Sequence, residues 1–206
     1  MKEAWFDEKI LPLLLDATCS LKPIRRQRTK VVPQASGKVL EIGIGTGLNL
    51  SCYDPGRISL IVGLDPSEPM HRLARRRIKA AAVPAEFVAV YAEGMPFPDD
   101  SFDSVVSTCT LCSVSDPSAV LLEIKRVLRP GGRFLFSEHG LSLEEHVAKW
   151  QYRLQPYWER IAGGCHLDRN IPLLLDQNGF SARMSSGYIM RPRITGYTYW
   201  GEASAV

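Results

Sequence analysis

Three glycines alternate along residues 39–49, VLEIGIGTGLN, after a short apolar run that contains one acidic residue. The glycines are Gly43, Gly45 and Gly47, and the acid is Glu41. Glycine at a turn between a strand and a helix lets a ligand approach the bare backbone. We therefore interpret this stretch as part of a binding site for a small ligand.

The spacing of these glycines differs from that of a dinucleotide site. Such a site has G-x-G-x-x-G, whereas the third glycine arrives one residue earlier here. A pyrophosphate disfavours a nearby carboxylate such as Glu41, while a cationic ligand tolerates or prefers it. Asp65 follows Gly47 by 18 residues and ends the next apolar run, where its carboxylate can accept hydrogen bonds from both hydroxyls of a ribose. The pattern favours a cationic ligand with a ribose and argues against a nicotinamide oxidoreductase.

Short apolar runs and amphipathic helical patterns alternate from residue 38 onward and would position these residues. Strands are predicted at 38–43, 58–65, 85–90, 102–109 and 133–138, with two more near 181–189 and 193–200. Helices are predicted to begin near 47, after Ser67 and after Asp116, with a further helix around 169–178. Strands joined in this way form a parallel sheet with right-handed crossovers.

Residues 1–30 are predicted to form a helical cap that precedes the main domain, residues 31–206. The stretch AWFDEKILPLLLDA has an apolar side at helical spacing, made by Trp5, Phe6, Ile10, Leu13 and Leu14. This side would cap a cleft, mediate a dimer or pack on the body of the protein.

Composition excludes several classes of protein. The net charge of +3 is too small to indicate a nucleic-acid partner. Basic residues gather at 22–30 and 72–79, which we interpret as solvated faces, with attraction to an anionic ligand or peripheral contact with a membrane as the alternative. No run approaches the roughly 18 apolar residues of a membrane-spanning helix. Five cysteines, an odd number, do not suggest a disulfide framework, so we expect a cytoplasmic protein.

Four stretches follow one another in order: VLEIGIGTGLN, GLDPSEPM, AEGMPFPDDSFD and EIKRVLRPGGRFLF. Together they resemble the class I S-adenosylmethionine-dependent methyltransferases. The resemblance implies an α/β fold, a Rossmann-like three-layer sandwich with a seven-stranded, mostly parallel sheet and an antiparallel last strand. It also implies that residues 31–206 are the methyltransferase domain, that S-adenosyl-L-methionine is the cofactor and that S-adenosyl-L-homocysteine is the product.

The same resemblance assigns the cofactor site. The glycine turn faces the amino-acid part of the cofactor, the acid after the second strand holds the ribose, and the loop after the third strand meets the adenine. In that order the residues are Glu41, Gly43, Gly45 and Gly47; Asp65; and Ala92, Glu93 and Met95, with Pro66 and Met70 beside the adenine. Many relatives have an acid where this chain has Tyr91, so either backbone amides and Glu93 hold the adenine or the ring stacks differently.

Cys109 and Cys112 form a C-x-x-C at the end of the fourth predicted strand. A zinc site needs a second pair of ligands at suitable spacing, and a thioredoxin-type pair opens a helix instead of ending a strand. We therefore predict no metal site. Cys109 and Thr110 are expected to line the cofactor pocket, and the other cysteines to pack.

The tail of the chain carries a narrower resemblance. CTLCSV, the EH after the fifth strand, an aromatic helix with W…P.W and the turn GCHLDR are similar to the branch of the animal alkyl-thiol methyltransferases associated with lipid membranes. The long hydrophobic N-terminal anchor of those proteins has no counterpart here, so we do not expect their membrane association. Bacterial phospholipid N-methyltransferases have stretches similar to GTGLNL and DPSEPM in the first half of the chain, and they are the alternative family branch.

The chemistry of methyl transfer helps to decide between a thiol and an amine or phospholipid as the acceptor. Methyl transfer is an in-line displacement that needs an aligned lone pair. A thiol, with a pKa near ~8.5, becomes a thiolate with the help of one histidine, whereas an amine or hydroxyl needs a stronger base. His139 and His166 are therefore predicted as catalytic residues, and a small apolar thiol is slightly favoured over a phospholipid or another amine.

The aromatic helix would help to form the acceptor site. Trp150, Tyr152, Tyr157 and Trp158 cannot all face one side of a helix, so some are expected in the core and the rest around an apolar substrate pocket.

We expect a monomer or a homodimer. A binding protein of the same fold that transfers nothing is a further alternative.

Overall fold

The computed structural model describes residues 9–206, so the predicted roles of Trp5 and Phe6 lie outside the described residues. Its strands are β1 (Gly37–Ile42), β2 (Ile58–Leu64), β3 (Ala85–Val88), β4 (Phe102–Thr108), β5 (Leu128–His139), β6 (Phe180–Tyr188) and β7 (Tyr197–Ala205). Its helices are α2 (Leu11–Cys19), α3 (Lys22–Val31), α4 (Glu68–Ala80), α5 (Pro117–Val127), α6 (Glu145–Ile161), α7 (Ile171–Gln177) and α8 (Arg193–Gly196). Two short 3₁₀ turns are η1 (Val32–Gln34) and η2 (Leu50–Cys52).

The seven strands form one sheet in the order β3-β2-β1-β4-β5-β7-β6. Strands β1 to β5 are parallel, and β7 runs antiparallel to both of its neighbours, β5 and β6. The predicted sheet is therefore confirmed. The strand order reverses between β1 and β4, and open α/β sheets bind ligands in the crevice at this point.

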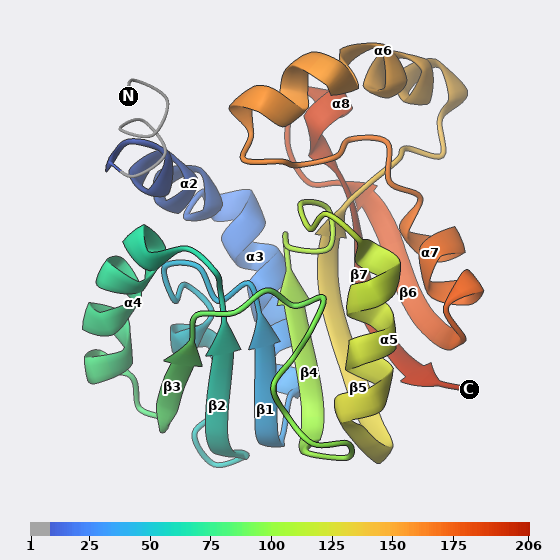
Figure 1. The fold of residues 1–206 in the computed structure, drawn as a ribbon. Coiled ribbons are helices and arrows are strands. Elements are labelled where there is room, and N and C mark those ends of the chain that lie inside the picture. Colours follow the sequence, from blue (N-terminus) through green and yellow to red (C-terminus); the bar gives the residue numbers. More distant parts are fainter. Residues whose placement is uncertain (1–8) are drawn as a thin grey trace.

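Helices cover both faces of the sheet, with α5 in front of it and α3 behind it in Figure 1. The buried side chains accordingly form two cores. One core joins the sheet to α5 and α7, through residues such as Val120 and Leu175, and the other joins it to α3, through Val31. This arrangement is the predicted three-layer sandwich.

The alternation of side chains along β1 decides which core each residue enters. Leu40 and Ile42 point toward the core on the α5 side, and Val39 points toward the core on the α3 side. Glu41 shares the face of Val39 because successive side chains of a strand alternate. The sequence thus directs a carboxylate into the layer that α3 covers.

Helices α2 and α3 both contact the domain that contains the sheet. Helix α3 contacts β5 and β7, and α2 precedes it above the ends of the strands (Figure 1). The predicted division at residue 30 falls inside α3, one residue before its end. The division itself stays a prediction.

The prediction of a helix that begins near residue 47 is wrong, because the chain forms only the short 3₁₀ turn η2 there. Tyr53 already has an extended backbone, with ψ of 145°, and its hydroxyl donates to Glu41. Pro55 further disfavours a helical conformation at Asp54. The glycine turn is consequently followed by an irregular segment held by side-chain hydrogen bonds.

Two boundaries and one cap also differ from the prediction. Residues 193–196 form α8, so the last strand begins at Tyr197, because the chain turns after Pro192 before it joins the sheet. Strand β5 begins at Leu128, which pairs with Phe102 before a register shift. Helix α5 begins after Asp116 as predicted, and the Asp116 carboxylate accepts from two backbone N–H groups. Ser67, the expected cap of α4, is its N-cap residue but makes no side-chain bond.

Candidate active site

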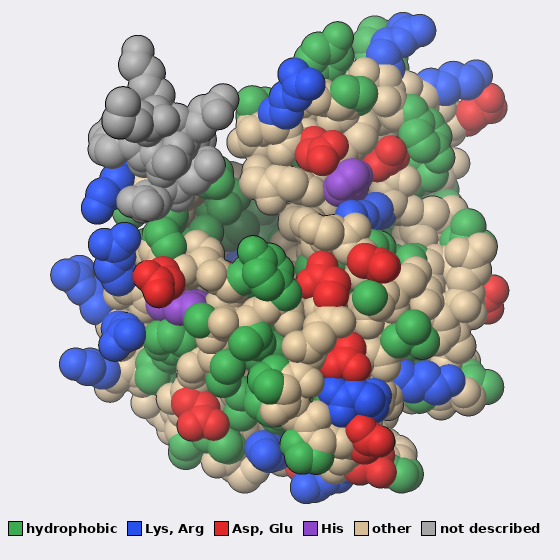
Figure 2. Space-filling view, viewed as in Figure 1, with side chains coloured by type: hydrophobic (Ala, Val, Ile, Leu, Met, Phe, Trp, Pro, Cys, Tyr) green, Lys and Arg blue, Asp and Glu red, His purple; other side chains and the backbone are tan. Residues whose placement is uncertain are grey.

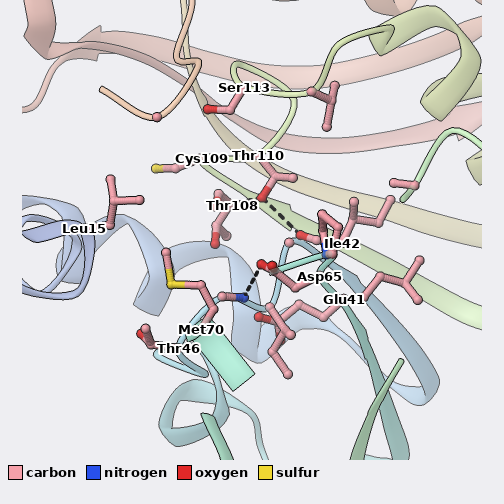
Figure 3. A pocket seen from close by; sticks show the side chains of 18 of the residues that line it. Leu15, Glu41, Ile42, Thr46, Asp65, Met70, Thr108, Cys109, Thr110 and Ser113 are labelled. Atoms are coloured by element: carbon pink, nitrogen blue, oxygen red, sulfur yellow. Dashed lines mark hydrogen bonds between the residues drawn. The ribbon is translucent and has the colours of Figure 1, made fainter. Parts of the chain in front are cut away.

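A cavity of about 330 Å³ lies at the carboxyl ends of β1, β2 and β4. The surface is hollowed beside α2, below the part of the molecule that contains α6 (Figure 2). Its wall combines the glycine turn, the end of β2, the loops after β3 and β4, helices α2 and α3, and the turn after α6. Figure 3 shows side chains from these segments pointing into the cavity.

Most of the predicted cofactor residues line this cavity. They are Glu41, Gly43, Gly45, Asp65, Pro66, Met70, Ala92, Glu93, Cys109 and Thr110. Gly47 and Met95 do not line it. Gly47 packs near Leu50 and α4, and Met95 is buried in the core.

Gly43 allows the glycine turn to pack beneath the loop after β4. Its φ of +64° is left-handed, and a Cβ there would lie 2.2 Å from Oγ1 of Thr110. That hydroxyl donates to the carbonyl of Ile42 (3.1 Å), as drawn in Figure 3. A side chain at Gly43 would therefore separate the two loops that form the middle of the cavity.

Asp65 ends β2 and holds two backbone segments with its carboxylate. Oδ2 accepts a hydrogen bond from the N–H of Gly45 (3.0 Å), and Oδ1 accepts one from the N–H of Ser67 (2.8 Å). Burial raises the pKa of Asp65, and these two hydrogen bonds oppose the rise. The carboxylate is thus fixed at the cavity, with acceptor capacity left for the hydroxyls of a ligand.

Glu41 is a buried acid, with 1% of its surface exposed. It accepts hydrogen bonds from the hydroxyl of Tyr53 (2.8 Å) and from Nδ2 of Asn49 (3.0 Å), and Asn49 also donates to Thr108 (2.9 Å). Burial raises the pKa of Glu41 to about 7, although the two hydrogen bonds act in the opposite direction. A positive charge beside this group would favour its ionised form.

Arg28 supplies positive charge to the same wall, and sequence reasoning missed it. Only 5% of its surface is exposed, and Nη1 donates to the carbonyl of Cys19 (2.5 Å). Its Nε is buried and has no hydrogen-bond partner within residues 9–206. Arg28 lowers the pKa of Glu41 by its charge, so the two groups lie within electrostatic reach of each other. A buried anion and cation in one wall fit a zwitterionic amino-acid group.

Asp16 also lines the cavity and was not predicted. Its carboxylate accepts hydrogen bonds from the hydroxyl of Thr46 (2.5 Å) and from Arg77 of α4 (2.7 Å). Arg77 donates in addition to the carbonyl of Thr46 (2.8 Å). These contacts hold α2 over the glycine turn.

The end of the cavity predicted for adenine has a different hydrogen-bond pattern from the expected one. Glu93 accepts from the N–H groups of Ser115 (3.2 Å) and Asp116 (3.4 Å), so its carboxylate holds the start of α5. Tyr91 lines the cavity and is 70% exposed. Both side chains flank the space, but Glu93 has fewer free lone pairs for a ligand.

The two predicted catalytic histidines lie near the cavity and not in its wall. His139 ends β5, and its Nδ1 is 3.4 Å from Sγ of Cys165. His166 follows α6, with its Nδ1 3.1 Å from Nε2 of Gln155 and 3.5 Å from the carboxylate of Asp168. Each histidine ring therefore contacts another side chain of the protein.

The aromatic side chains of α6 face outward to a greater extent than predicted. Trp150, Tyr152 and Tyr157 are exposed, and only Trp158 is half-buried. The buried face of α6 carries Gln151 and Gln155 instead. The prediction that some of these aromatic rings lie in the core fails, because the two glutamine amides bind backbone groups of neighbouring segments and take the buried positions expected for the rings.

Residues 9–206 contain no group of three or more histidine, cysteine or acidic side chains that could hold a metal ion. The five cysteines are all free. No helix within the described range is both long and apolar enough to cross a membrane.

The glycine turn, the acid at the end of β2 and the cavity at the strand reversal are the features of a nucleoside-cofactor site. Residues 40–136 match the family model described as "Methyltransferase domain". The chain belongs to the class I S-adenosylmethionine-dependent methyltransferases.

Among its relatives are two human thiol S-methyltransferases. Thiol S-methyltransferase TMT1B of Homo sapiens is 40% identical over 153 residues, which are 71% of this chain and 62% of that protein. Thiol S-methyltransferase TMT1A of Homo sapiens is 35% identical over 180 residues, which are 80% of this chain and 71% of that protein. The chain thus spans less than two thirds of the first of these relatives.

Two further comparisons extend the set. Phosphatidylethanolamine N-methyltransferase of Cereibacter sphaeroides is 34% identical over 117 residues, which are 56% of this chain and 57% of that protein. A solved S-adenosylmethionine-dependent methyltransferase of Methanosarcina mazei shares the fold, with a TM-score of 0.64, 24% identity and coverage of 84% of this chain and 94% of that one.

Proposed function

We propose that this protein transfers the methyl group of S-adenosyl-L-methionine to the sulfur of a small, apolar thiol, giving a thioether and S-adenosyl-L-homocysteine. The buried pair Glu41 and Arg28, in one cavity with Asp65, is the observation that supports the cofactor. Similarity to thiol S-methyltransferases supports the acceptor. When bound, the cofactor supplies an electrophilic methyl group on a sulfonium.

The residues of the cavity divide the work of binding. Glu41 would hold the ammonium group of the cofactor and Arg28 its carboxylate, and Asp65 would accept hydrogen bonds from the ribose. The other predicted cofactor residues would complete the site, including Gly47 and Met95, which act from behind the wall. Leu15 of α2 lies with Cys109 and Ser113 across the cavity from Met70 and Thr46 (Figure 3), and the acceptor would enter on this side.

An apolar wall suits a thiolate because water that would solvate the anion is excluded. In the reaction the thiol would first lose its proton. A lone pair of its sulfur would then attack the methyl carbon, so that a new S–C bond forms as the bond from that carbon to the cofactor's sulfur breaks and S-adenosyl-L-homocysteine leaves. We propose that His139 and His166 assist this step as positioning residues, since neither touches the cavity. A histidine near neutral pH can also receive a proton from a thiol through water.

A methyl-transfer screen with labelled cofactor tests the proposal. We expect small alkyl and aryl thiols to be methylated, while amines, phenols and liposomes of phosphatidylethanolamine give much less product. The alternative is an amine or phospholipid N-methyltransferase, which the bacterial relative supports. Methylation of the liposomes without methylation of thiols would replace our proposal with this alternative. Cofactor binding without transfer to any acceptor would indicate a non-catalytic binding protein.

Arg28 gives a prediction about the cofactor's carboxylate. Arg28→Met should weaken binding by about ten- to a hundredfold, because a charged hydrogen bond is worth roughly 1.5–3 kcal/mol. Calorimetry with S-adenosyl-L-homocysteine measures this change. Arg26→Met is the matched control, since Arg26 is exposed on the same helix. Equal affinities of the two variants would remove Arg28 from the site.

His166 gives a prediction about turnover. His166→Ala should lower kcat and leave cofactor affinity nearly intact, because the side chain lies outside the cofactor wall. His166→Gln retains a group that can hydrogen-bond to Gln155 and should restore part of the activity if the role is one of orientation. Turnover of His166→Ala equal to wild type, at all pH values between 6 and 9, would leave the histidine a packing role only.

We further propose a cytoplasmic protein that acts on a small molecule, with no nucleic-acid partner, as a monomer or a homodimer. The small net charge and the five free cysteines support this picture. Peripheral contact with a membrane is the alternative for the basic residues. Many of these residues lie on α4, where Lys and Arg side chains gather at the left of Figure 2.

A further inference from the structure

A cluster of thiol and imidazole groups lies beside the cavity and takes no part in the cofactor site. Cys165 comes from the turn after α6, His139 from the end of β5 and Cys112 from the loop after β4. Nδ1 of His139 is 3.4 Å from Sγ of Cys165. The N–H of His166 donates to the carbonyl of Cys112 (2.7 Å), which holds the two cysteine-bearing segments side by side.

The surroundings of Cys165 stabilise a thiolate. The neighbouring thiol of Cys112 and the contact with His139 hold the pKa of Cys165 well below its usual range, although burial opposes them. Nε2 of His139 is buried without a hydrogen-bond partner in the described part of the chain, so the contact of Nδ1 with Cys165 is the hydrogen bond that this ring makes there.

The other groups around the cluster do not share this activation. The neighbouring Cys165, together with burial, raises the pKa of Cys112, and burial is the first cause that raises the pKa of Cys109. Glu138 and Arg169 are the further charged groups close to these sulfurs. Cys165 is also partly exposed, whereas Cys112 is buried. The cluster therefore pairs one accessible thiolate with one protonated thiol.

We propose that Cys165 is an oxidation site that reacts with hydroperoxides and is then captured by Cys112 as a disulfide. The thiolate of Cys165 attacks one peroxide oxygen, the O–O bond breaks, and an alcohol leaves after protonation, so that the sulfur becomes a sulfenic acid. Cys112 loses its proton and attacks this sulfur, and the hydroxyl leaves as water. The two sulfurs together give up two electrons, which the peroxide accepts.

The disulfide would join two walls of the cavity. Ser113 follows Cys112 and lines one wall, and Ala162 and Gly163 precede Cys165 and line the other. A covalent bond between these segments would limit any widening of the cavity during acceptor entry and product release. Oxidation should therefore slow turnover. This consequence rests on the proposed function, whereas the covalent step does not.

The first experiment measures reactivity without turnover. Substoichiometric iodoacetamide at pH 6, followed by peptide mass mapping, should label Cys165 several-fold faster than the other four cysteines. Cys52 is the internal comparison, because it is partly exposed and lies in η2, away from the cluster. His139→Asn should slow the labelling of Cys165. Preferential labelling of any other cysteine would overturn the proposal.

The second experiment maps the disulfide. One equivalent of hydrogen peroxide should produce a peptide pair joined through Cys112 and Cys165, and Cys112→Ser should instead accumulate a sulfenic acid that dimedone traps. Methyl transfer should fall several-fold and recover with dithiothreitol, while Cys165→Ser retains activity after peroxide and Cys52→Ser behaves as wild type. A different cysteine pair, or the absence of both products, would refute the site. Mapped disulfide with unchanged turnover would contradict only the effect on the cavity.

Discussion

Replacing Asp65 with alanine is expected to weaken the binding of S-adenosyl-L-homocysteine by about a hundredfold or more. Two hydrogen bonds from the ribose to a carboxylate would be lost, each worth roughly 1.5–3 kcal/mol. The variant also loses the bonds to the N–H groups of Gly45 and Ser67, so the glycine turn becomes less well fixed. Isothermal titration calorimetry measures the change directly.

Two variants separate these effects. Asp176→Ala removes an exposed carboxylate on α7, far from the cavity wall, and should bind as wild type does. Asp65→Asn keeps a carbonyl oxygen for one backbone bond and should fall between wild type and Asp65→Ala. An unchanged dissociation constant for Asp65→Ala would show that Asp65 lies outside the cofactor site.

The affinity for the same ligand is expected to rise by about tenfold between pH 5.5 and 7. Burial raises the pKa of Glu41 to about 7, so this acid is largely protonated at pH 5.5 in the free protein. A bound ammonium group favours the ionised form, and the α-amino group, with a pKa near ~7.7–8.0, keeps its charge over this range. Binding therefore takes a proton from Glu41 at low pH and weakens there.

Glu41→Gln removes this titration. Its affinity should be lower than that of wild type by roughly 1.5–3 kcal/mol at pH 7, and nearly independent of pH below it. A pH slope equal to that of wild type would assign the titration to another group. The same raised pKa also predicts that wild-type stability from this group is complete below about pH 4.5 and is lost as pH rises toward 7, on the order of 3 kcal/mol. Denaturation of Glu41→Gln beside wild type measures that loss.

The sheet and the part of the cavity formed by the strand ends could be predicted because both follow from local patterns. The apolar runs and the helices between them define parallel strands, and the carboxyl ends of such strands meet at one edge. Glu41, Asp65 and Cys109 each lie at or near such an end, so their convergence follows from the topology.

Arg28 and Asp16 could not be predicted in the same way. They belong to helices whose position over the sheet depends on tertiary packing, and the basic composition of residues 22–30 indicated a solvated face. Arg28 instead shares the buried face of α3 with Gln27 and Val31. Arg28 is buried within electrostatic reach of Glu41, an acid on another element, and no spacing in the sequence indicates such a pairing.

The polar buried face of α6 has a thermodynamic consequence. Gln151 accepts from the N–H of Ser142 (2.8 Å) and donates to the carbonyls of Gly140 and Ile194, and Gln155 accepts from the N–H of Leu167 (2.6 Å). Detachment of this helix would expose mostly amides and backbone, so it should have a small heat-capacity change and a weak dependence on denaturant. Amide hydrogens of the segments it holds should therefore exchange through local opening, well before those of the central strands.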